Sequence, residues 1–296
     1  MVNASTKLCS ATLFFIVIGL TSFGGLVDAA SLGSRENPLR MMFVPSGDSQ
    51  VILKGGQEIA RHLEKATGLY FKTSVATSYA AVIEAMGAGK VDIGWLATFS
   101  YVLAHENYGV DIILIVMRFG SPFYRGQIMV RTNSGINKLA ELKDKTFAFV
   151  DPTSTSGHLY PKSLLLSKGF DPKSFFSKSV FVGSHNAAVL SILKGEVDGA
   201  AAYEDARAAV ANSFPEVYKK TKVIAYTKNI PNDVVAVRKG LEPKLKQNIK
   251  EGLKYLAQTP GGAKVLKKLY GISGLADLDG FFDPVREMGK LLDLNF

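Results

Sequence analysis

Short apolar runs alternate with segments of helical periodicity along most of the chain. Runs at residues 39–44, 91–96 and 146–150 are bounded by polar turns, which is typical of strands buried in a sheet. The first run is followed by a polar turn and by a helix that ends near Ala66. Ser78 precedes another apolar-periodic segment and is the expected N-cap of that helix. The alternation predicts an α/β fold.

Two series of such strand and helix units follow one another. Further strands are expected at residues 69–75, 112–118, 127–131, 179–182, 197–202, 222–226 and 234–238, and helices at 79–86, 186–194, after the turn at 151–158, and over most of the chain beyond 238. Gly120-Ser121-Pro122 interrupts the strand pattern, as a crossover between two lobes would. The segments GKVDIG at 89–94 and GEVDGA at 195–200 each open a buried strand. We therefore expect two similar α/β lobes, with ligands bound beyond the carboxyl ends of their strands.

The composition is that of a protein with a large packed core. Of the 296 residues, 47% are hydrophobic and one is a cysteine, which excludes a disordered chain and a disulfide scaffold. Lys and Arg number 35 against 26 Asp and Glu, a formal charge of +9. The lysines are dispersed along helical stretches and are not interleaved with arginine and stacking aromatics. We expect solvated helix faces and no nucleic-acid partner.

The N-terminus has the pattern of a cleavable export signal. Lys7 precedes an apolar run at residues 11–20, which is shorter than the length of about 20 residues that a membrane-spanning helix needs. Small residues around Ala29 provide a cleavage site, so residues 1–29 are the expected signal peptide and the mature chain is expected in the periplasm. A permanent N-terminal anchor is the alternative. Cys9 lies before the apolar run, so no lipid anchor is expected there, and cleavage would remove the only cysteine.

The most informative polar segment is the turn DPTSTSG at residues 151–157. Ser154, Thr155 and Ser156 stand in a row before Gly157, at an expected strand-to-helix junction. A helix N-terminus presents unpaired N–H groups and a partial positive charge, and adjacent hydroxyls add donors for the oxygens of a phosphoryl-type anion. One hydroxyl suffices for an ordinary N-cap, which is the alternative interpretation. The turn is therefore a candidate oxyanion site.

Several segments, in their order along the mature chain, resemble the periplasmic phosphonate- and phosphite-binding proteins of ABC importers. They are Tyr79-Ala80 before its helix, VDIGWL at 91–96, GSPFY at 120–124, DPTSTSG at 151–157, Gly183-Ser184-His185, and Ile230-Pro231-Asn232-Asp233 followed by Arg238. The resemblance implies an α/β, two-lobed periplasmic-binding-protein fold of the type II-like class, with the ligand in the interlobe cleft. We place lobe 1 at residues 37–123 plus 239–296 and lobe 2 at residues 124–238.

The resemblance also implies a set of ligand-binding side chains that surround an anion in the cleft. They comprise the hydroxyls of the turn, two pocket tyrosines, a pocket histidine and two carboxylates: Ser154, Thr155, Ser156, Tyr79, Tyr124, His185, Asp205 and Asp233. Hydroxyl, phenol and imidazole groups all donate to phosphorus-bound oxygens. Without the resemblance, Tyr79 and Tyr124 are interpreted as core residues, and His185 equally as a pocket or a loop residue.

The two carboxylates bear on the choice of ligand. A carboxylate beside a phosphonate costs energy unless a positive group or a proton lies between them. The ammonium of 2-aminoethylphosphonate meets that need, and so does a protonated P–OH of phosphite or methylphosphonate. Where relatives that bind the aminoalkyl ligand are expected to use Glu, this chain has the shorter Asp205, although an error of one position would place Glu204 there. We expect phosphite or a small phosphonate such as methylphosphonate, with 2-aminoethylphosphonate as the alternative.

An enzyme is the rival class, because Ser156, His185 and Asp205 are the residue types of a hydrolase triad. No G-x-S-x-G elbow surrounds Ser156, the histidines are not spaced as a metal-dependent phosphatase requires, and the sequence has no Walker A motif. We expect a monomeric binding protein without catalytic residues, metal or cofactor, which delivers its ligand to an ABC permease in the membrane. A periplasmic phosphoester or phosphonate hydrolase, and a binding lobe that signals to a membrane receptor, are the alternatives.

Overall fold

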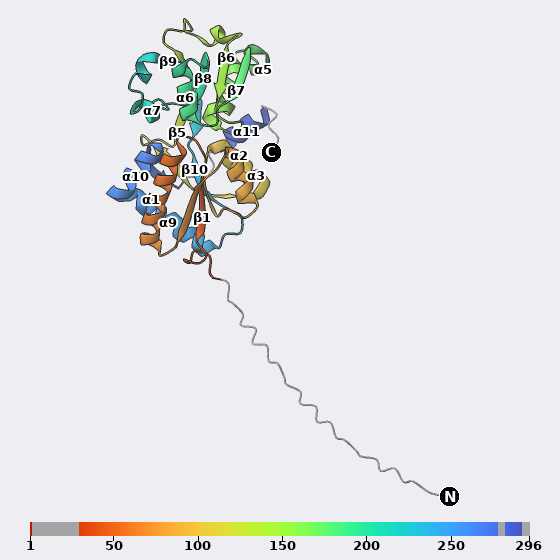
Figure 1. Cartoon of the computed structure of the whole chain (residues 1–296), viewed down its shortest axis with the longest axis vertical. Coiled ribbons are helices and arrows are strands. Elements are labelled where there is room, and N and C mark those ends of the chain that lie inside the picture. Colours follow the sequence, from red (N-terminus) through yellow and green to blue (C-terminus); the bar gives the residue numbers. More distant parts are fainter. Residues whose placement is uncertain (2–29, 278–281, 292–296) are drawn as a thin grey trace. The chain divides into compact units, whose positions relative to one another are not determined.

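The computed structural model describes Met1, residues 30–277 and residues 282–291 (Figure 1). The expected signal peptide, apart from Met1, and its cleavage site near Ala29 lie outside these residues. Residues 31–296 form one unit, which contains both sheets of the protein. Within the described ranges, no helix combines the length and the apolar character that a membrane crossing requires.

The first sheet combines parallel and antiparallel strands. In the described part of the chain its strands are β1 (Leu39–Phe43), β2 (Phe71–Val75), β3 (Ile93–Leu96), β4 (Asp111–Arg118), β10 (Val234–Val237) and β11 (Ile272–Ala276). Their order across the sheet is β11-β4-β10-β3-β1-β2. β1 pairs in parallel with β2 and β3, whereas β10 runs antiparallel between β3 and β4, and β11 runs antiparallel to β4.

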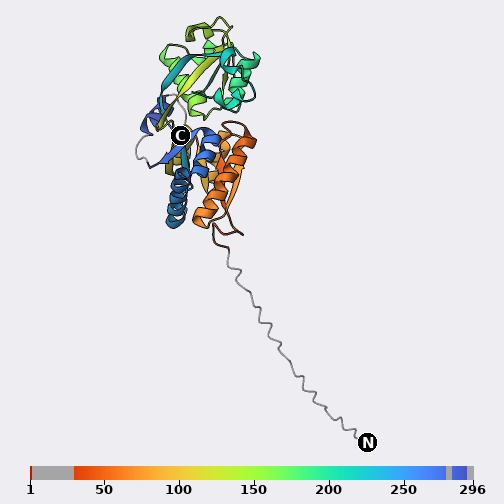
Figure 2. The same cartoon turned by 90° about the vertical axis from the view of Figure 1, so that its left-hand side faces the viewer.

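Helices cover both faces of this sheet. They are α1 (Ser49–Thr67), α9 (Pro243–Gln258) and α10 (Pro260–Tyr270) on one face, and α2 (Tyr79–Gly87) and α3 (Thr98–Tyr108) on the other. Figure 2 shows α1, in orange, beside the blue helices α9 and α10. α1 begins at the Asp48 carboxylate, which accepts hydrogen bonds from the N–H groups of Gln50 and Val51. Because both faces are covered, the central strands β3 and β10 are buried along their whole length.

The second sheet is covered in the same way. Its strands are β5 (Phe123–Arg131), β6 (Thr146–Phe149), β7 (Lys178–Phe181), β8 (Gly199–Tyr203) and β9 (Thr221–Pro231), in the order β7-β6-β8-β5-β9. One face packs against α4 (Tyr160–Ser167) and α5 (Pro172–Phe175), and the other against α6 (His185–Lys194), α7 (Ala208–Ala211) and α8 (Val217–Lys220). A single π-helical turn, η2 (Thr155–Leu159), precedes α4 and continues into it. A short 3-10 helix, η1 (Leu139–Leu142), precedes β6, and α11 (Asp283–Leu291) packs on α3 of the first lobe.

The chain passes between the two lobes at residues 119–122 and 232–233. The first passage is the crossover expected from the break in the strand pattern. The second lies earlier than the expected boundary at residue 238, which is therefore wrong, because β10 pairs with β3 and β4 and so belongs to lobe 1. The two passages touch one another, since the N–H of Asn232 donates to the carbonyl of Pro122 at 2.8 Å. The two passages therefore lie side by side and are joined by a hydrogen bond.

The expected elements are present, with differences at their ends. The Ser78 hydroxyl caps α2 as predicted, accepting from the N–H of Ala81 at 3.1 Å. The strand expected at residues 222–226 extends to Pro231, because it pairs along β5 as far as Phe123. β11 lies in a C-terminal segment that was expected to be mostly helical, and it is stabilised as a strand by pairing with β4. Strand ends are thus set by partners that are distant in sequence.

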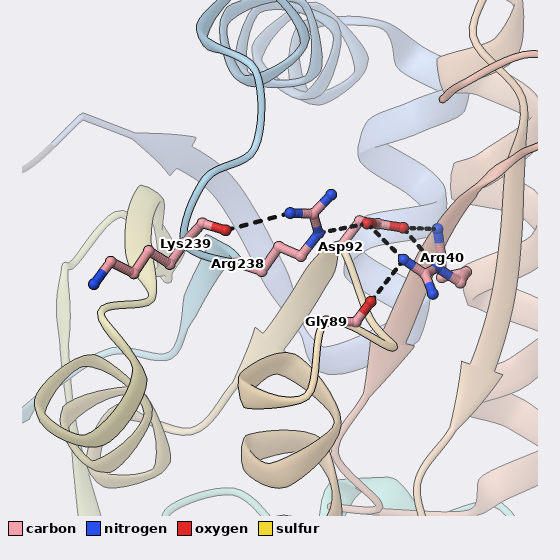
Figure 3. A network of polar contacts seen from close by, with 5 residues as sticks. All are labelled: Arg40, Gly89, Asp92, Arg238 and Lys239. Carbon is pink, nitrogen blue, oxygen red and sulfur yellow. Dashed lines mark hydrogen bonds and ion pairs between the residues drawn. The ribbon is translucent and has the colours of Figure 1, made fainter. Parts of the chain in front are cut away.

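The two similar segments found in the sequence form an equivalent clamp in each lobe. Asp92 precedes β3 and accepts from the backbone N–H of Arg40 on β1 at 2.8 Å. Asp198 precedes β8 and accepts from the backbone N–H of Thr146 on β6 at 3.0 Å. Asp92 is fully buried and also binds the guanidinium groups of Arg40 and Arg238 (Figure 3). Each aspartate therefore ties the start of a central strand to its neighbours and leaves the opposite end of the strand for the site.

Candidate functional site

A cavity of about 140 Å³ is lined by residues of both lobes. Lobe 1 contributes the starts of α1 and α2, the residue before α3 and the last residues of α10, and lobe 2 contributes the starts of η2 and α6. Helix N-termini carry a partial positive charge and N–H groups without partners inside the helix. The convergence of several such termini makes the cavity suited to an anion.

Most of the predicted binding residues line this cavity. They are Tyr79, Tyr124, Ser154, Thr155, Ser156, His185 and Asp233. Several elements supply them, namely α2, β5, η2, α6 and the second passage between the lobes. Side chains that are widely separated in sequence are thus gathered around one space.

The Ser154 hydroxyl is the N-cap of η2. Its Oγ accepts from the N–H of Gly157 at 3.1 Å, so the capping interpretation is confirmed for this residue. A side chain at Gly157 would collide with Val150 and would lie 2.9 Å from Ser154 Oγ. Glycine therefore permits the close approach of the turn to β6 that places the hydroxyls at the cavity.

Thr155 and Ser156 use their hydroxyls differently. Thr155 Oγ1 accepts from the N–H of Phe99, 2.8 Å away in lobe 1. Ser156 lies close to the phenol of Tyr124 and opposes the rise that burial causes in the pKa of that phenol. A hydroxyl oxygen that accepts one bond keeps its own O–H for donation. Both residues are almost fully buried and line the cavity, and the O–H of Thr155 remains available for donation there.

His185 is a neutral donor. Burial, and secondly the positive charge of Arg118, lower the pKa of His185 to about 3. Nδ1 accepts from the backbone N–H of Tyr203 at 3.1 Å, so the proton of the neutral ring lies on Nε2. The imidazole therefore offers an N–H donor to the cavity that does not depend on pH near neutrality.

The protonation of His185 can be measured directly. We expect nitrogen NMR of the folded chain to show the neutral Nε2–H tautomer of His185 throughout the range from about pH 5 to pH 8, in which an ordinary histidine titrates. The His185→Gln variant identifies the resonance. A titration step within that range, or a proton on Nδ1, would contradict the assignment.

Arg118 is a cavity residue that the sequence did not reveal. Its Nη2 donates to Asp233 Oδ2 at 3.1 Å, and the guanidinium lies over the rings of Tyr124 and Tyr203, with centroids 5.7 and 5.3 Å away. Burial raises the pKa of Asp233 above its usual value even though Arg118 opposes the shift. An arginine at the end of a strand is usually exposed to solvent, so the residue type did not indicate a place in the cavity. The only indication in the sequence was that Arg118 stands next to the expected crossover between the lobes. Other lining residues not found from the sequence include Ser46, Asn186, Tyr203, Lys268 and Tyr270.

Several buried polar atoms around the cavity lack a protein partner. Among the described residues, Tyr79 Oη, Arg118 Nε and Asn186 Oδ1 form no hydrogen bond although all three residues line the cavity. Buried polar atoms are nearly always hydrogen-bonded, since an unmet group costs about 1–3 kcal/mol. Burial also raises the pKa of Tyr79 and Tyr124, so both phenols keep their protons. These atoms give the wall of the cavity hydrogen-bonding capacity that no described protein group uses.

The prediction that Asp205 is a binding residue is wrong, because Asp205 does not line the cavity. β8 ends at Tyr203, and Asp205 lies exposed in the turn that follows, with a left-handed φ of 65°. Glu204, the alternative at this position, instead receives a hydrogen bond from the Arg125 guanidinium at 2.9 Å. The ring of Tyr203 occupies the cavity wall. Neither carboxylate therefore lines the cavity.

The arrangement differs from that of a hydrolase triad. In such a triad a carboxylate accepts from the Nδ1–H of the histidine, whereas His185 Nδ1 here accepts from a backbone N–H. The triad carboxylate would have been Asp205, which lies outside the cavity. In the described part of the chain, no group of three or more His, Cys, Asp or Glu side chains is placed to hold a metal ion.

Hydrogen bonds join the lobes around the cavity. The N–H of His185 donates to the carbonyl of Ser46 at 3.0 Å, and the Ser100 hydroxyl donates to the carbonyl of Thr153 at 3.3 Å. With the bond between Phe99 and Thr155, these contacts connect α3 and the loop before α1 in lobe 1 to α6, η2 and the turn before η2 in lobe 2. The structure therefore shows the lobes in contact on the side where the cavity lies.

Comparison with known proteins agrees with this geometry. A family model described as "ABC transporter, phosphonate, periplasmic substrate-binding protein" matches residues 41–280. The "Phosphonates-binding periplasmic protein" of Escherichia coli K12 is 28% identical over 295 residues, covering 98% of this chain and 86% of that protein. The "Phosphate-import protein PhnD" of Mycolicibacterium smegmatis is 31% identical over 172 residues, covering 54% of this chain and 53% of that one. The structure of PhnD1 from Prochlorococcus marinus with methylphosphonate superposes with a TM-score of 0.79 at 20% identity, covering 87% and 98% of the two chains.

Proposed function

Because the chain belongs to the family of periplasmic substrate-binding proteins of phosphonate ABC transporters, we propose that it captures a small reduced-phosphorus oxyanion, phosphite or a small phosphonate such as methylphosphonate. It has the two-lobed, type II-like fold of this family, as the resemblance predicted. The observation that carries the proposal is the ring of buried donors around the cavity, several of which have no partner among the described residues. Family members are extracytoplasmic and operate with a membrane permease.

The donors have distinct roles in the proposed complex. The hydroxyls of Thr155 and Ser156, with the N-terminus of η2, bind the phosphorus-bound oxygens. The Tyr79 and Tyr124 phenols and His185 Nε2–H supply further hydrogen bonds. Ser154 acts through the cap that fixes the turn. Asp233, with its raised pKa, is suited to accept from a protonated P–OH.

Binding and release, without covalent chemistry, is the proposed action. The ligand shifts the lobes towards the closed arrangement, and the closed form delivers it to the permease. The orientation of His185 supports a binding protein over the hydrolase alternative. We propose that the mature chain acts as a monomer in the periplasm after cleavage near Ala29, and that it uses no metal, cofactor or nucleic acid. Turnover of a phosphonate or phosphate ester by the purified chain would overturn the proposal that the chain binds and releases its ligand without covalent chemistry.

The ligand class is tested by calorimetric titration of the mature, ligand-stripped chain. We expect phosphite or methylphosphonate to bind with a stoichiometry of one, and phosphate and sulfate to bind at least about tenfold more weakly, because their additional oxygen needs a further partner in a buried site. 2-Aminoethylphosphonate is included as the alternative ligand. Absence of heat with all five anions would contradict the proposed function. Tight binding of phosphate alone would show that phosphate, and not a reduced-phosphorus anion, is the ligand.

A further inference from the structure

The cavity holds an ion pair that no catalytic or capping role explains. We propose that Arg118, paired with Asp233, is a filter for ligand charge that restricts the cavity to oxyanions whose substituent carries no positive charge. Arg118 is then the residue that excludes aminoalkyl phosphonates. This inference rests on the proposed function of the same cavity and adds the class of substituent that it accepts.

Arg118 is held rigidly at the cavity wall. It is the last residue of β4 and is followed by the first passage between the lobes, while Asp233 directly precedes β10. The side chain of Arg118 is 11% exposed and donates to Asp233 at 3.1 Å. The rings of Tyr124 and Tyr203 lie against its guanidinium. The positive charge therefore has a fixed position beside the ligand space.

Asp233 is the carboxylate that an ammonium group would need. Of the described residues that line the cavity, the acidic ones are Asp48 and Asp233. Asp48 lies at the exposed start of α1, where its oxygen already accepts from two backbone N–H groups. Asp205 lies outside the cavity. An ammonium group that enters the cavity thus meets a carboxylate already paired with Arg118.

The charges favour an anion without a cationic tail. A phosphonate gains from the guanidinium, whose buried Nε has no hydrogen-bond partner among the described residues and is available to the ligand. An ammonium substituent places a second positive charge beside Arg118, and like charges in a buried site are strongly unfavourable. If the ammonium displaced Arg118 from Asp233, the guanidinium would lose its buried partner, which is also costly.

A pair of ligands of equal size isolates the charge. Propylphosphonate and 2-aminoethylphosphonate have the same number of heavy atoms and differ by a methyl group in place of an ammonium. We expect the unmodified chain to bind propylphosphonate at least about tenfold more tightly than 2-aminoethylphosphonate. In Arg118→Met the freed Asp233 can pair with the ammonium, so the order of the two affinities should reverse.

Two further variants serve as controls. Arg125→Met removes an arginine that pairs with Glu204 outside the cavity, at 2.9 Å, and should leave the ratio of affinities as in the unmodified chain. Asp233→Asn together with Arg118→Met removes both charges and should abolish the reversal. Thermal unfolding checks that each variant is folded. If Arg118→Met does not fold, Arg118→Gln, which retains a donor for Asp233, should shift the ratio in the same direction.

The outcomes separate the inference from the proposed function. Failure of phosphite and methylphosphonate to bind the unmodified chain would overturn the proposed function itself. Binding of methylphosphonate with an unchanged ratio in the Arg118 variants would overturn only the charge filter. Rejection of both propylphosphonate and 2-aminoethylphosphonate by the unmodified chain would show that size excludes the tail, and would also overturn the filter.

Discussion

Replacing Thr155 with valine is expected to lower the affinity for phosphite or methylphosphonate at least about a hundredfold, equivalent to about 3 kcal/mol. The substitution keeps the shape of the side chain but removes a buried donor to the anion. It also removes the oxygen that accepts from the Phe99 N–H across the lobes, so the contact that joins η2 to α3 is lost. Calorimetric titration, with whichever of the two anions the unmodified chain binds, measures the effect.

Thr153→Val is the matched control for Thr155. Thr153 lies two residues earlier in the same turn, its hydroxyl donates to Asp151, and it does not line the cavity. We expect the affinity of the Thr153→Val variant for the anion to remain within about threefold of that of the unmodified chain. Substitutions away from a site usually change a free energy by about 0.5 kcal/mol or less. Equal losses in the two variants would show that Thr155 acts on the stability of the turn and not on the ligand.

Replacing Asp92 with asparagine is expected to cost about 3 kcal/mol of unfolding free energy at neutral pH. The Asp92 side chain is fully buried and accepts from the Arg40 backbone N–H, from the Arg40 guanidinium and from Arg238 Nε at 2.8 Å. Burial alone would raise the pKa of Asp92, but the bonds from Arg40 and Arg238 outweigh it and hold the pKa below its usual value. The neutral amide of asparagine cannot satisfy two guanidinium groups.

The loss should depend on pH in a defined direction. Because the pKa of Asp92 is lowered on folding, its contribution is complete above the ordinary aspartate pKa of about 3.9 and is lost as the pH falls further. The difference between the unmodified chain and Asp92→Asn should therefore be largest near neutrality and shrink below about pH 4. Urea unfolding at several pH values measures this.

Asp198→Asn provides the control from the other lobe. Asp198 occupies the equivalent position before β8, but its side chain is 33% exposed and its arginine partner, Arg131, is 3.5 Å away. A loss of about 1 kcal/mol is expected, since exposed ion pairs contribute little. The role assigned to Asp92 would be contradicted if the loss of unfolding free energy in Asp92→Asn stayed constant down to strongly acidic pH. A larger loss of unfolding free energy in Asp198→Asn than in Asp92→Asn would contradict it as well.

Local sequence was sufficient to predict the strand-to-helix turn at residues 151–157 as a candidate oxyanion site, whereas the other predicted side chains that line the cavity came from the family resemblance. Ser154, Thr155 and Ser156 stand at a strand-to-helix junction, and the N-terminus of a helix has the same electrostatic character in any fold. The division of roles among them was not predictable. Only the N–H groups from which the hydroxyls accept, Gly157 in the same turn and Phe99 in the other lobe, distinguish the capping hydroxyl of Ser154 from the hydroxyl of Thr155 that joins the lobes.

The errors have a common physical cause. The apolar segment Val234–Val237 predicts a strand in either lobe, and only pairing with β3 and β4 places it in the first sheet. The family resemblance implied Asp205 as a cavity residue, but β8 ends at Tyr203 and Asp205 lies in the turn that follows, with a left-handed φ of 65°. Arg118 and Asp233 are 115 residues apart, so neither predicts the other as a partner.

The sequence by itself determined the α/β alternation, the family resemblance and the chemistry of the candidate oxyanion turn, because these follow from periodicity and from groups that are adjacent in the chain. Tertiary structure alone decided which carboxylate faces the cavity, which hydroxyl joins the lobes and where the chain crosses between them. These depend on strand partners and on burial, and both are set by contacts between residues distant in sequence. The charge of the site, Arg118 beside Asp233, belongs to this second group.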